Sequence, residues 1–122
     1  MTNPSTTNVQ PARGELWLIR FDPTQGAEIG KKRPAVVVNP EAVGRLPLRI
    51  VVPVTGWKHE FAAVPWLVQL RPAAMNGLRK ISTADCFQVK SISVGRFDSK
   101  LGKLRADELE EISAAIALCV GA

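Results

Sequence analysis

The chain has 122 residues, enough for one ordinary domain with a single hydrophobic core. Sixteen Lys and Arg against eleven Asp and Glu give a net charge of +5, but residues 105–122 carry −3 and the remaining 104 residues carry +8. A body this basic favours a polyanionic partner such as nucleic acid, or an acidic protein. No apolar run is long enough to cross a bilayer, so we expect a soluble protein with no membrane partner.

The first twelve residues, "MTNPSTTNVQPA", are polar, contain two prolines and lack the cationic and apolar regions of a signal peptide. They predict a disordered tail over 1–12, followed by a single domain over 13–122. Cys86 and Cys119 lie in apolar surroundings without CxxC spacing, which is typical of buried free thiols in a reducing cytoplasm. The single histidine, His59, has no second ligand nearby, so we expect no metal site.

The first half of the domain predicts three strands. Residues 14–21, "GELWLIRF", suit a strand that is buried on much of both faces, and "DPTQG" supplies the turn that ends it. The β-branched run Val36–Val38 follows a proline and predicts a second strand. Residues 48–55, "LRIVVPVT", predict a third. Because Pro53 cannot donate to a ladder, we expect an edge or a bulge there, with the ladder broken near Thr55.

The second half predicts further strands and one helix. "GWKHEFAAV" indicates an exposed connection, "PWLVQL" a fourth strand, "RPAAMNG" a turn, and "LRKISTADCFQVKSI" one bent strand or two. Helical spacing at the end of the chain predicts a helix over about 106–119. The apolar residues that recur there at spacings of three and four are Leu109, Ile112, Ile116 and Cys119. This order predicts a mainly β fold, a small barrel of five to seven strands closed by one C-terminal helix.

Most of the residue patterns that enzymes use are missing. Carboxylates cluster only in "DELEE", where the electrostatics of a helix start explains them, so a metal-dependent nuclease is not indicated. The chain has no GxSxG, which argues against a serine hydrolase, and no GxGxxG or Walker loop, which argues against a nucleotide cofactor. We therefore expect no cofactor.

One loop, "DPTQGAEIGKKRP", concentrates the remaining chemistry. In it the carboxylate Glu28 precedes three consecutive cations, Lys31, Lys32 and Arg33. With the Thr55 hydroxyl, such groups suit metal-free RNA cleavage, in which the RNA 2′-OH attacks and the enzyme stabilises the phosphorane and moves two protons. Arg33 hardly ever loses its proton and so suits electrostatic stabilisation, while Glu28 is the nearest candidate base. From these residues alone, a ribonuclease and a plain nucleic-acid-binding barrel both remain open.

Four motifs in register resemble the MazF/PemK toxins of bacterial type II toxin–antitoxin systems. The family pattern of R-G-[ED]-[IL]-W, D-P-T-x-G-x-E, R-P-[AV]-hydrophobic and V-P-[VC]-T is matched by "RGELWLIRFDPTQGAEIGKKRPAVVVNP" and "RLPLRIVVPVT". The match runs from Arg13 to the terminal helix, which is nearly the whole domain.

The resemblance implies an SH3-like barrel that forms a homodimer and acts as a metal-independent, sequence-selective endoribonuclease on single-stranded RNA. Its products would end in a 2′,3′-cyclic phosphate and begin with a 5′-OH. It also implies a cognate acidic antitoxin, MazE-like, whose disordered tail covers the RNA groove, which fits the charge of +8. The alternative is a related barrel that has lost catalysis and serves as a binding or gyrase-inhibiting module.

Carried over residue by residue, the resemblance implies roles for four side chains. Arg33 matches the catalytic arginine before proline, and Thr55 matches the hydroxyl residue that closes V-P-x-T. Glu28 matches the loop acid proposed as a proton acceptor in some members. Gln88 matches a glutamine at the RNA-binding surface, and a structural hydrogen-bonding role is its alternative.

The chain departs from the family at the residue before Gln88. The PemK-like branch commonly has Cys-Asp-Gln, whereas here Phe87 stands between Cys86 and Gln88. Asp85 stands two positions before Phe87, on the same strand face but displaced by about 7 Å. We therefore expect altered RNA sequence preference with the chemistry retained, and Asp85 is a candidate RNA-binding residue.

Other candidate RNA-binding residues lie in two loops. Trp57, Lys58 and His59 follow Thr55, and an aromatic ring beside cations is a common way to hold single-stranded bases. His59 has two readings, a general acid or an exposed loop residue. Lys31 and Lys32 are expected to track phosphates.

Overall fold

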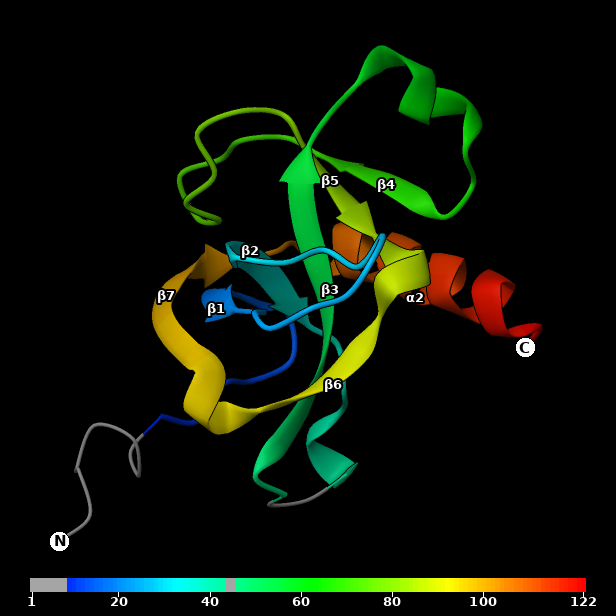
Figure 1. Cartoon of the computed structure of the whole chain (residues 1–122). Coiled ribbons are helices and arrows are strands. Elements are labelled where there is room, and N and C mark those ends of the chain that lie inside the picture. Colours follow the sequence, from blue (N-terminus) through cyan, green and yellow to red (C-terminus); the bar gives the residue numbers. More distant parts are fainter. Residues whose placement is uncertain (1–8, 44–45) are drawn as a thin grey trace, which may run out of the picture.

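The computed structural model describes residues 9–43 and 46–122 (Figure 1). Its strands are β1 (Glu15–Arg20), β2 (Lys32–Val37), β3 (Leu48–Gly56), β4 (Leu67–Leu70), β5 (Ser82–Asp85), β6 (Lys90–Ser93) and β7 (Phe97–Lys103). The 3₁₀ helices are η1 (Glu41–Val43), η2 (His59–Ala63), η3 (Cys86–Gln88) and η4 (Val94–Arg96), and the α-helix is α2 (Ala106–Val120). The prediction of a mainly β fold with a C-terminal helix is confirmed.

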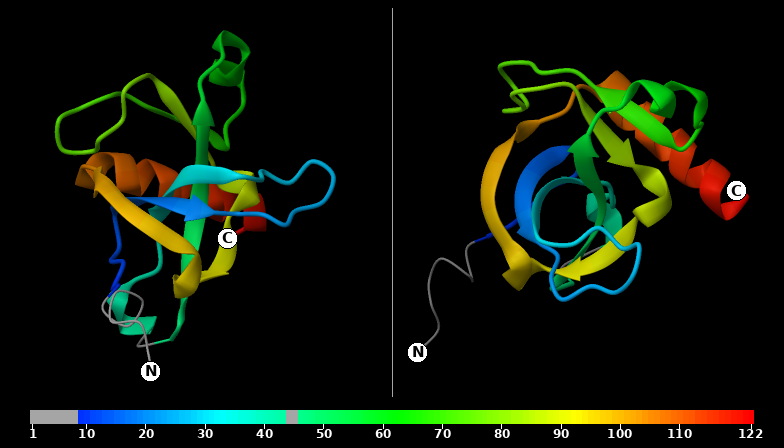
Figure 2. Two further views of the ribbon diagram at one scale, coloured as in Figure 1. Left: turned by 60° about the vertical axis from the view of Figure 1, so that its left-hand side comes forward. Right: turned by 45° about the horizontal axis from the view of Figure 1, so that its top comes forward.

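All strand pairings are antiparallel, and the sheet order is β4-β5-β3-β2-β1-β7, with β6 paired to β3. The strands curve into a ring, which Figure 2 (right) shows nearly end on. Within the described ranges no pairing joins β6 to β7, so the sheet is not closed by hydrogen bonds. The predicted small barrel is therefore an open one.

Alternate side chains of the central strands enter two apolar clusters, as the period of two in a strand requires. The helix-side cluster lies between the sheet and α2. Its buried members are Leu16, Val36, Val38, Val52, Val54, Val68, Leu70, Ala84, Cys86, Leu104, Ile112 and Ala115. The barrel-side cluster fills the concave side of the curved sheet. Its buried members are Ile19, Phe21, Ala35, Val37, Val51, Ile92 and Phe97.

β3 is a central strand that runs unbroken through Pro53 and pairs with β2 there, so the expected edge strand or bulge is wrong. The expected break in the ladder is present on the other side of β3, at residues 52–53, while Thr55 itself pairs with Thr83. Along one edge, residues 48–51 of β3 pair with β6 and residues 54–56 pair with β5. Pro53 lies in the gap between these two partners. A missing N–H removes no ladder bond toward β5 or β6 at that point, so the strand tolerates proline there.

The segment predicted as one bent strand or two is two strands, β5 and β6, separated by η3. The predicted helix over about 106–119 is confirmed by α2. At its start the buried Glu108 carboxylate accepts a hydrogen bond from the Arg105 backbone N–H at 3.2 Å, which explains part of the acidic run. Cys86 is buried as expected, whereas Cys119 is only half-buried.

Part of the predicted tail, residues 1–8, lies outside the described residues. In residues 9–12 the chain packs on the domain: Pro11 is buried, and its carbonyl accepts a hydrogen bond from Arg49 Nε at 2.8 Å. The domain boundary at residue 13 stays a prediction. Across the described ranges, no helix is long and apolar enough to cross a membrane.

Candidate functional site

Arg33 and Thr55 lie at the same end of neighbouring strands. The last pair of the β2–β3 ladder is Ala35 with Pro53. Arg33 lies two residues before Ala35, and Thr55 lies two residues after Pro53, so both are just beyond this pair. Both side chains then share the sheet face that carries Ala35, at the end of the barrel-side cluster. Side chains on one face of adjacent strands are neighbours, so Arg33 and Thr55 are candidates to contact one phosphate.

The Arg33 guanidinium is available to an anion. It is half-buried, and its Nε donates to the Gly30 carbonyl at 3.4 Å. In residues 9–43 and 46–122, no carboxylate forms an ion pair with it. A charged fork that is held by the backbone but is not neutralised suits electrostatic stabilisation of a phosphorane.

The two lysines beside Arg33 have different surroundings. Lys31 is exposed, has a φ of 64°, and its backbone N–H donates to Asp22 Oδ1 at 2.7 Å. Lys32 Nζ lies 3.0 Å from Asp98 Oδ2 of β7, so its charge is partly neutralised. Their predicted role as phosphate-tracking cations stays a prediction.

Glu28 lies in the β1–β2 loop, which extends away from the sheet in Figure 2 (left). Its Oε1 accepts a hydrogen bond from the Gln25 backbone N–H at 2.7 Å, and its Oε2 lies 3.9 Å from Lys90 Nζ. In the described part of the chain, no hydrogen bond or ion pair joins Glu28 to Arg33. The loop places this carboxylate toward β6, so its role as a base stays a prediction.

Gln88 in η3 holds the β1–β2 loop. Its Oε1 accepts from the Ile29 backbone N–H at 2.7 Å, and its Nε2 donates to Asp85 Oδ2 at 3.3 Å. The structural alternative for Gln88 is thus observed, and the RNA contacts of Gln88 and Asp85 stay predictions. Asp85 Oδ1 is buried with no partner in the described residues, and this burial raises the pKa of the Asp85 carboxyl, opposed by contacts with Phe87 and Gln88.

In the segment predicted to stack on bases, residues 57–59, the Trp57 side chain packs partly against the protein itself. Trp57 is half-buried, and its ring meets the Phe61 ring edge to face, with centroids 5.9 Å apart. Lys58 is exposed, and His59 is an exposed residue at the start of η2. The exposed connection predicted here therefore contains a short helix, and RNA contacts of these three residues stay predictions.

Two lysines near the site, Lys80 and Lys90, were not among the residues predicted from the sequence, and Phe87 was named only as a departure from the family. Lys80 Nζ lies 3.6 Å from the position that a Cβ on Gly56 would occupy, next to Thr55. Lys90 reaches Glu28, and Phe87 is 64% exposed. No sequence signal could place Lys80 there, because the loop that carries it is brought to β3 only by the β3–β5 pairing.

Comparison with known proteins identifies the family of this chain. A family model described as PemK-like, MazF-like toxin of type II toxin–antitoxin system matches residues 12–120. The chain belongs to this family. It is 33% identical over 112 residues to the endoribonuclease MazF9 of Mycobacterium tuberculosis, covering 87% of this chain and 92% of the relative. It is 35% identical over 83 residues to the endoribonuclease PemK of Escherichia coli, covering 67% of this chain but 60% of PemK.

A solved structure supports the same assignment. The crystal structure of MazF from Deinococcus radiodurans superposes with a TM-score of 0.77 at 29% identity, covering 92% of this chain and 97% of that one. The MazF/PemK resemblance found from the motifs is confirmed.

The first MazF/PemK motif, R-G-E-L-W, is structural in this chain. Arg13 donates to the Val38 carbonyl and, at 3.2 Å, to Ser113 Oγ of α2, which ties β2 to the helix. Glu15 Oε1 accepts from the Ala12 backbone N–H and from Trp17 Nε1, both at 2.9 Å. The motif therefore builds the barrel around the site without entering it.

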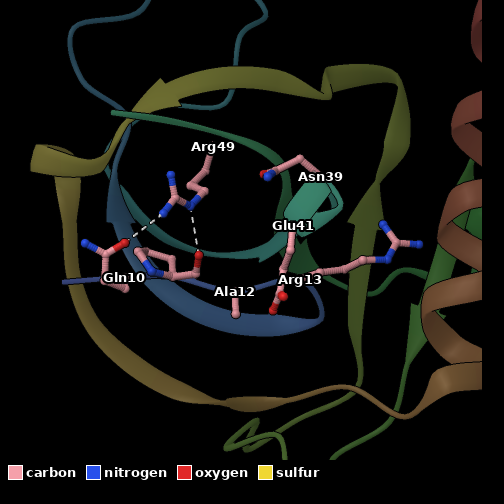
Figure 3. Close-up of a pocket in the computed structure, with 7 residues that line it drawn as sticks. Gln10, Ala12, Arg13, Asn39, Glu41 and Arg49 are labelled. Carbon is pink, nitrogen blue, oxygen red and sulfur yellow. Dashed lines mark hydrogen bonds between the residues drawn. The ribbon is translucent and has the colours of Figure 1, made fainter. Parts of the chain in front are cut away.

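A polar pocket of about 200 Å³ lies at the other end of β3 from Thr55 (Figure 3). Arg49 enters it, and its donors are used by the Pro11, Leu46 and Leu48 carbonyls at 2.8, 2.8 and 2.9 Å. Because the Arg49 guanidinium already donates to backbone carbonyls, we assign this pocket of the MazF/PemK barrel a structural role. Among the described residues, no group of three or more His, Cys, Asp or Glu side chains is placed to hold a metal ion.

Proposed function

We propose that this chain is the toxin of a type II toxin–antitoxin system and acts as a metal-independent, sequence-selective endoribonuclease on single-stranded RNA. The observation that supports the proposal is that Arg33 and Thr55 lie just beyond the last pair of the β2–β3 ladder, at the same end of the two strands. Family membership supports it, since the two curated relatives are named endoribonucleases.

The reaction proposed uses the RNA's own nucleophile. The 2′-oxygen attacks the adjacent phosphorus and gives up its proton to a base, the bond from phosphorus to the 5′-oxygen breaks, and the 5′-oxygen takes up a proton. The products are a 2′,3′-cyclic phosphate and a 5′-OH. DNA lacks the hydroxyl and does not react.

Arg33 and Thr55 would stabilise the charge that develops on the phosphorane. The guanidinium offers donors that remain protonated, and the Thr55 hydroxyl donates from the opposite strand. Fixed donors of this kind act without reorganisation during the reaction. Lys80, near Gly56, adds positive charge beside the same phosphate.

Glu28 is the proposed base, and in the free protein it is held by Gln25 and Lys90. His59, exposed at the start of η2, is the alternative group for proton transfer.

The proposed partners follow from charge and exposed apolar surface. An acidic antitoxin complements the +8 of residues 1–104 and agrees with the toxin–antitoxin description of the family. A homodimer would cover exposed apolar side chains of which Trp66 and Phe87, with ring centroids 5.8 Å apart, form one pair. We place the protein in the cytoplasm, where RNA and antitoxin are available.

The non-catalytic gyrase-inhibitor alternative is not favoured by the comparisons, and the chain keeps both Arg33 and Thr55. A supercoiling assay with purified gyrase separates the two readings, because the proposed ribonuclease leaves supercoiling unchanged.

The test is cleavage of a long single-stranded RNA by purified protein in EDTA. We expect discrete fragments with cyclic phosphate ends, loss of cleavage in Arg33→Ala, and retention in Arg105→Ala, an arginine beyond the far end of β7. Circular dichroism of each variant reports folding. Intact RNA in every sequence tested, with folded wild-type protein, would show that the enzyme proposal is wrong.

A further inference from the structure

The β1–β2 loop, residues 21–31, is folded by hydrogen bonds between its own residues. The Gln25 backbone N–H donates to Glu28 at 2.7 Å, and the Lys31 backbone N–H donates to Asp22 at 2.7 Å. Both bonds join residues within the loop, so neither fixes the loop to the rest of the domain. The attachment of its far half must come from another element.

Gln88 supplies that attachment from η3. Its Oε1 accepts from the Ile29 backbone N–H at 2.7 Å, and its Nε2 approaches the Ala27 carbonyl at 3.4 Å, across 59 and 61 residues of chain. One side chain thereby grips the backbone on both sides of Glu28. The ion pair of Lys90 with Glu28 is a weaker tether, because the two groups are 3.9 Å apart and partly exposed.

Asp85 decides which way the Gln88 amide faces. A carboxylate only accepts hydrogen bonds, so the Nε2 of Gln88 must face Asp85 Oδ2, 3.3 Å away. This leaves Oε1 for the Ile29 N–H. In the reversed orientation, Oε1 would face a carboxylate and Nε2 would face a donor, so both contacts would be repulsive. Asp85 is itself placed by its pairing with Leu67 of β4.

The Gln88 contact with Ile29 is linked to Arg33 through one intervening residue, Gly30. Ile29 precedes Gly30, whose carbonyl accepts from Arg33 Nε at 3.4 Å. A Cβ on Gly30 would lie 2.6 Å from Thr24 Oγ1 and 2.7 Å from Asp22 Oδ1, so the loop is tightly folded at this point. The position of the guanidinium therefore depends on where the loop holds Gly30.

We propose that Gln88, oriented by Asp85, is a positioning residue that clamps the β1–β2 loop and thereby places the Arg33 guanidinium to stabilise the phosphorane. The clamp itself is a property of the free protein. Its effect on catalysis rests on the proposed ribonuclease function. This role differs from a direct RNA contact, in which Gln88 would act only when RNA is bound.

Amide hydrogen exchange of the free protein tests the clamp without RNA. In Gln88→Leu, which keeps the volume but loses both polar groups, we expect the Ile29 amide to exchange about tenfold faster while amides of β2 and β3 keep their rates. Gln25→Leu, at an exposed glutamine in the same loop, is the matched control and leaves Ile29 unchanged. Gln88→Asn, one methylene shorter, gives the same loosening if the leucine variant folds poorly.

A charge swap tests the part played by Asp85. Gln88→Glu sets two carboxylates against each other and is expected to free Ile29 at least as much as Gln88→Leu. Adding Asp85→Asn supplies a donor toward the new carboxylate, so the double variant should regain several-fold of the lost protection at Ile29. If the double variant protects Ile29 no better than the single one, the orienting role of Asp85 is wrong.

Kinetics on single-stranded RNA tests the positioning role. Gln88→Leu should lower kcat about tenfold with KM within about twofold, because Arg33 acts on the transition state. A rise in KM with kcat unchanged, together with wild-type exchange at Ile29, would overturn the proposal in favour of a direct RNA contact. Faster exchange with unchanged kcat would refute the positioning role. If wild-type protein cleaves no RNA, the proposed function fails, and the exchange rates still decide the clamp.

Discussion

Lys32 Nζ of β2 lies 3.0 Å from Asp98 Oδ2 of β7, so this ion pair spans the intervening strand β1. Consecutive residues of a strand point to opposite faces, so only one of the two cations, Lys32 or Arg33, can share a face with Thr55. We expect Arg33→Ala to lower kcat by about 100-fold or more, and Lys32→Ala to change KM by about threefold at most. Single-turnover cleavage of a labelled RNA measures both. Equal losses in the two variants would mean that the loop cations act as one undivided patch.

Thr55 and Thr83 lie opposite each other on β3 and β5 but differ in burial, so their variants separate a catalytic role from a structural one. Thr83 is fully buried, and its Oγ1 donates to the Gly56 carbonyl at 3.0 Å, whereas Thr55 is half-exposed. We expect Thr83→Val to lower the free energy of unfolding by about 1 kcal/mol. Thr55→Val should instead lower kcat and leave unfolding within about 0.5 kcal/mol. Urea titrations beside cleavage assays measure both, and a reversed pattern would contradict the assignment of Thr55.

Glu15 should stabilise the fold in a pH-dependent way. Burial would raise the pKa of its carboxyl, but Lys100, the Ala12 amide and the Trp17 indole outweigh burial and hold the pKa below its usual range. A carboxyl with a depressed folded pKa adds stability above its unfolded pKa and loses it as the pH falls through the folded value. We expect Glu15→Gln to cost about 1–3 kcal/mol at neutral pH, with a smaller cost in acid.

Unfolding of wild type and Glu15→Gln by denaturant at several pH values measures this difference. Glu41→Gln, at an exposed carboxylate in η1, is the control and should follow the wild-type curve. A cost that stays constant from acid to neutral pH would show that the Glu15 charge is unimportant.

Asp85 should show the opposite pH dependence. Burial raises the pKa of its carboxyl, so between the unfolded and folded pKa values the folded state binds more protons, and its stability falls as the pH rises. We expect the stability of Asp85→Asn relative to wild type to increase from about pH 4 toward neutral pH, because the variant has no charge to bury. Denaturant unfolding across that window measures it. A relative stability that decreases over the window would contradict the raised pKa.

Two glycines should differ sharply in their tolerance of alanine. A Cβ on Gly102 would lie 2.2 Å from the Met75 carbonyl oxygen, because the β4–β5 loop crosses β7 there, while a Cβ on Gly26 meets nothing within 4 Å. We expect Gly102→Ala to destabilise by about 3 kcal/mol or more, and Gly26→Ala by about 1 kcal/mol from its φ of 57°. Thermal unfolding compares them, and similar midpoints would mean that the loop moves aside at little cost.

Short-range pattern predicted much of the secondary structure. The β-branched runs around Val36 and Val52 alternate between the two apolar clusters, and the helical spacing around Ile112 marks α2. These features follow from the periods of strand and helix, which neighbouring residues decide. The sequence predicted a ladder break near Pro53 but not its place within a central strand, because that place depends on β5 and β6, far along the chain, ending on either side of it.

The residues of the candidate site were predictable from the sequence, but their contacts were not. The sequence by itself determined the residue types that the chemistry needs, since the motifs select Arg33, Thr55 and Glu28 and exclude the familiar metal and nucleotide patterns. Only the tertiary structure decided their partners: Lys32 with Asp98, and Gln88 with Ile29, 59 residues away. Such contacts depend on strand register and on how η3 packs against the loop. They join residues that are far apart in the chain, so no local period in the sequence predicts them.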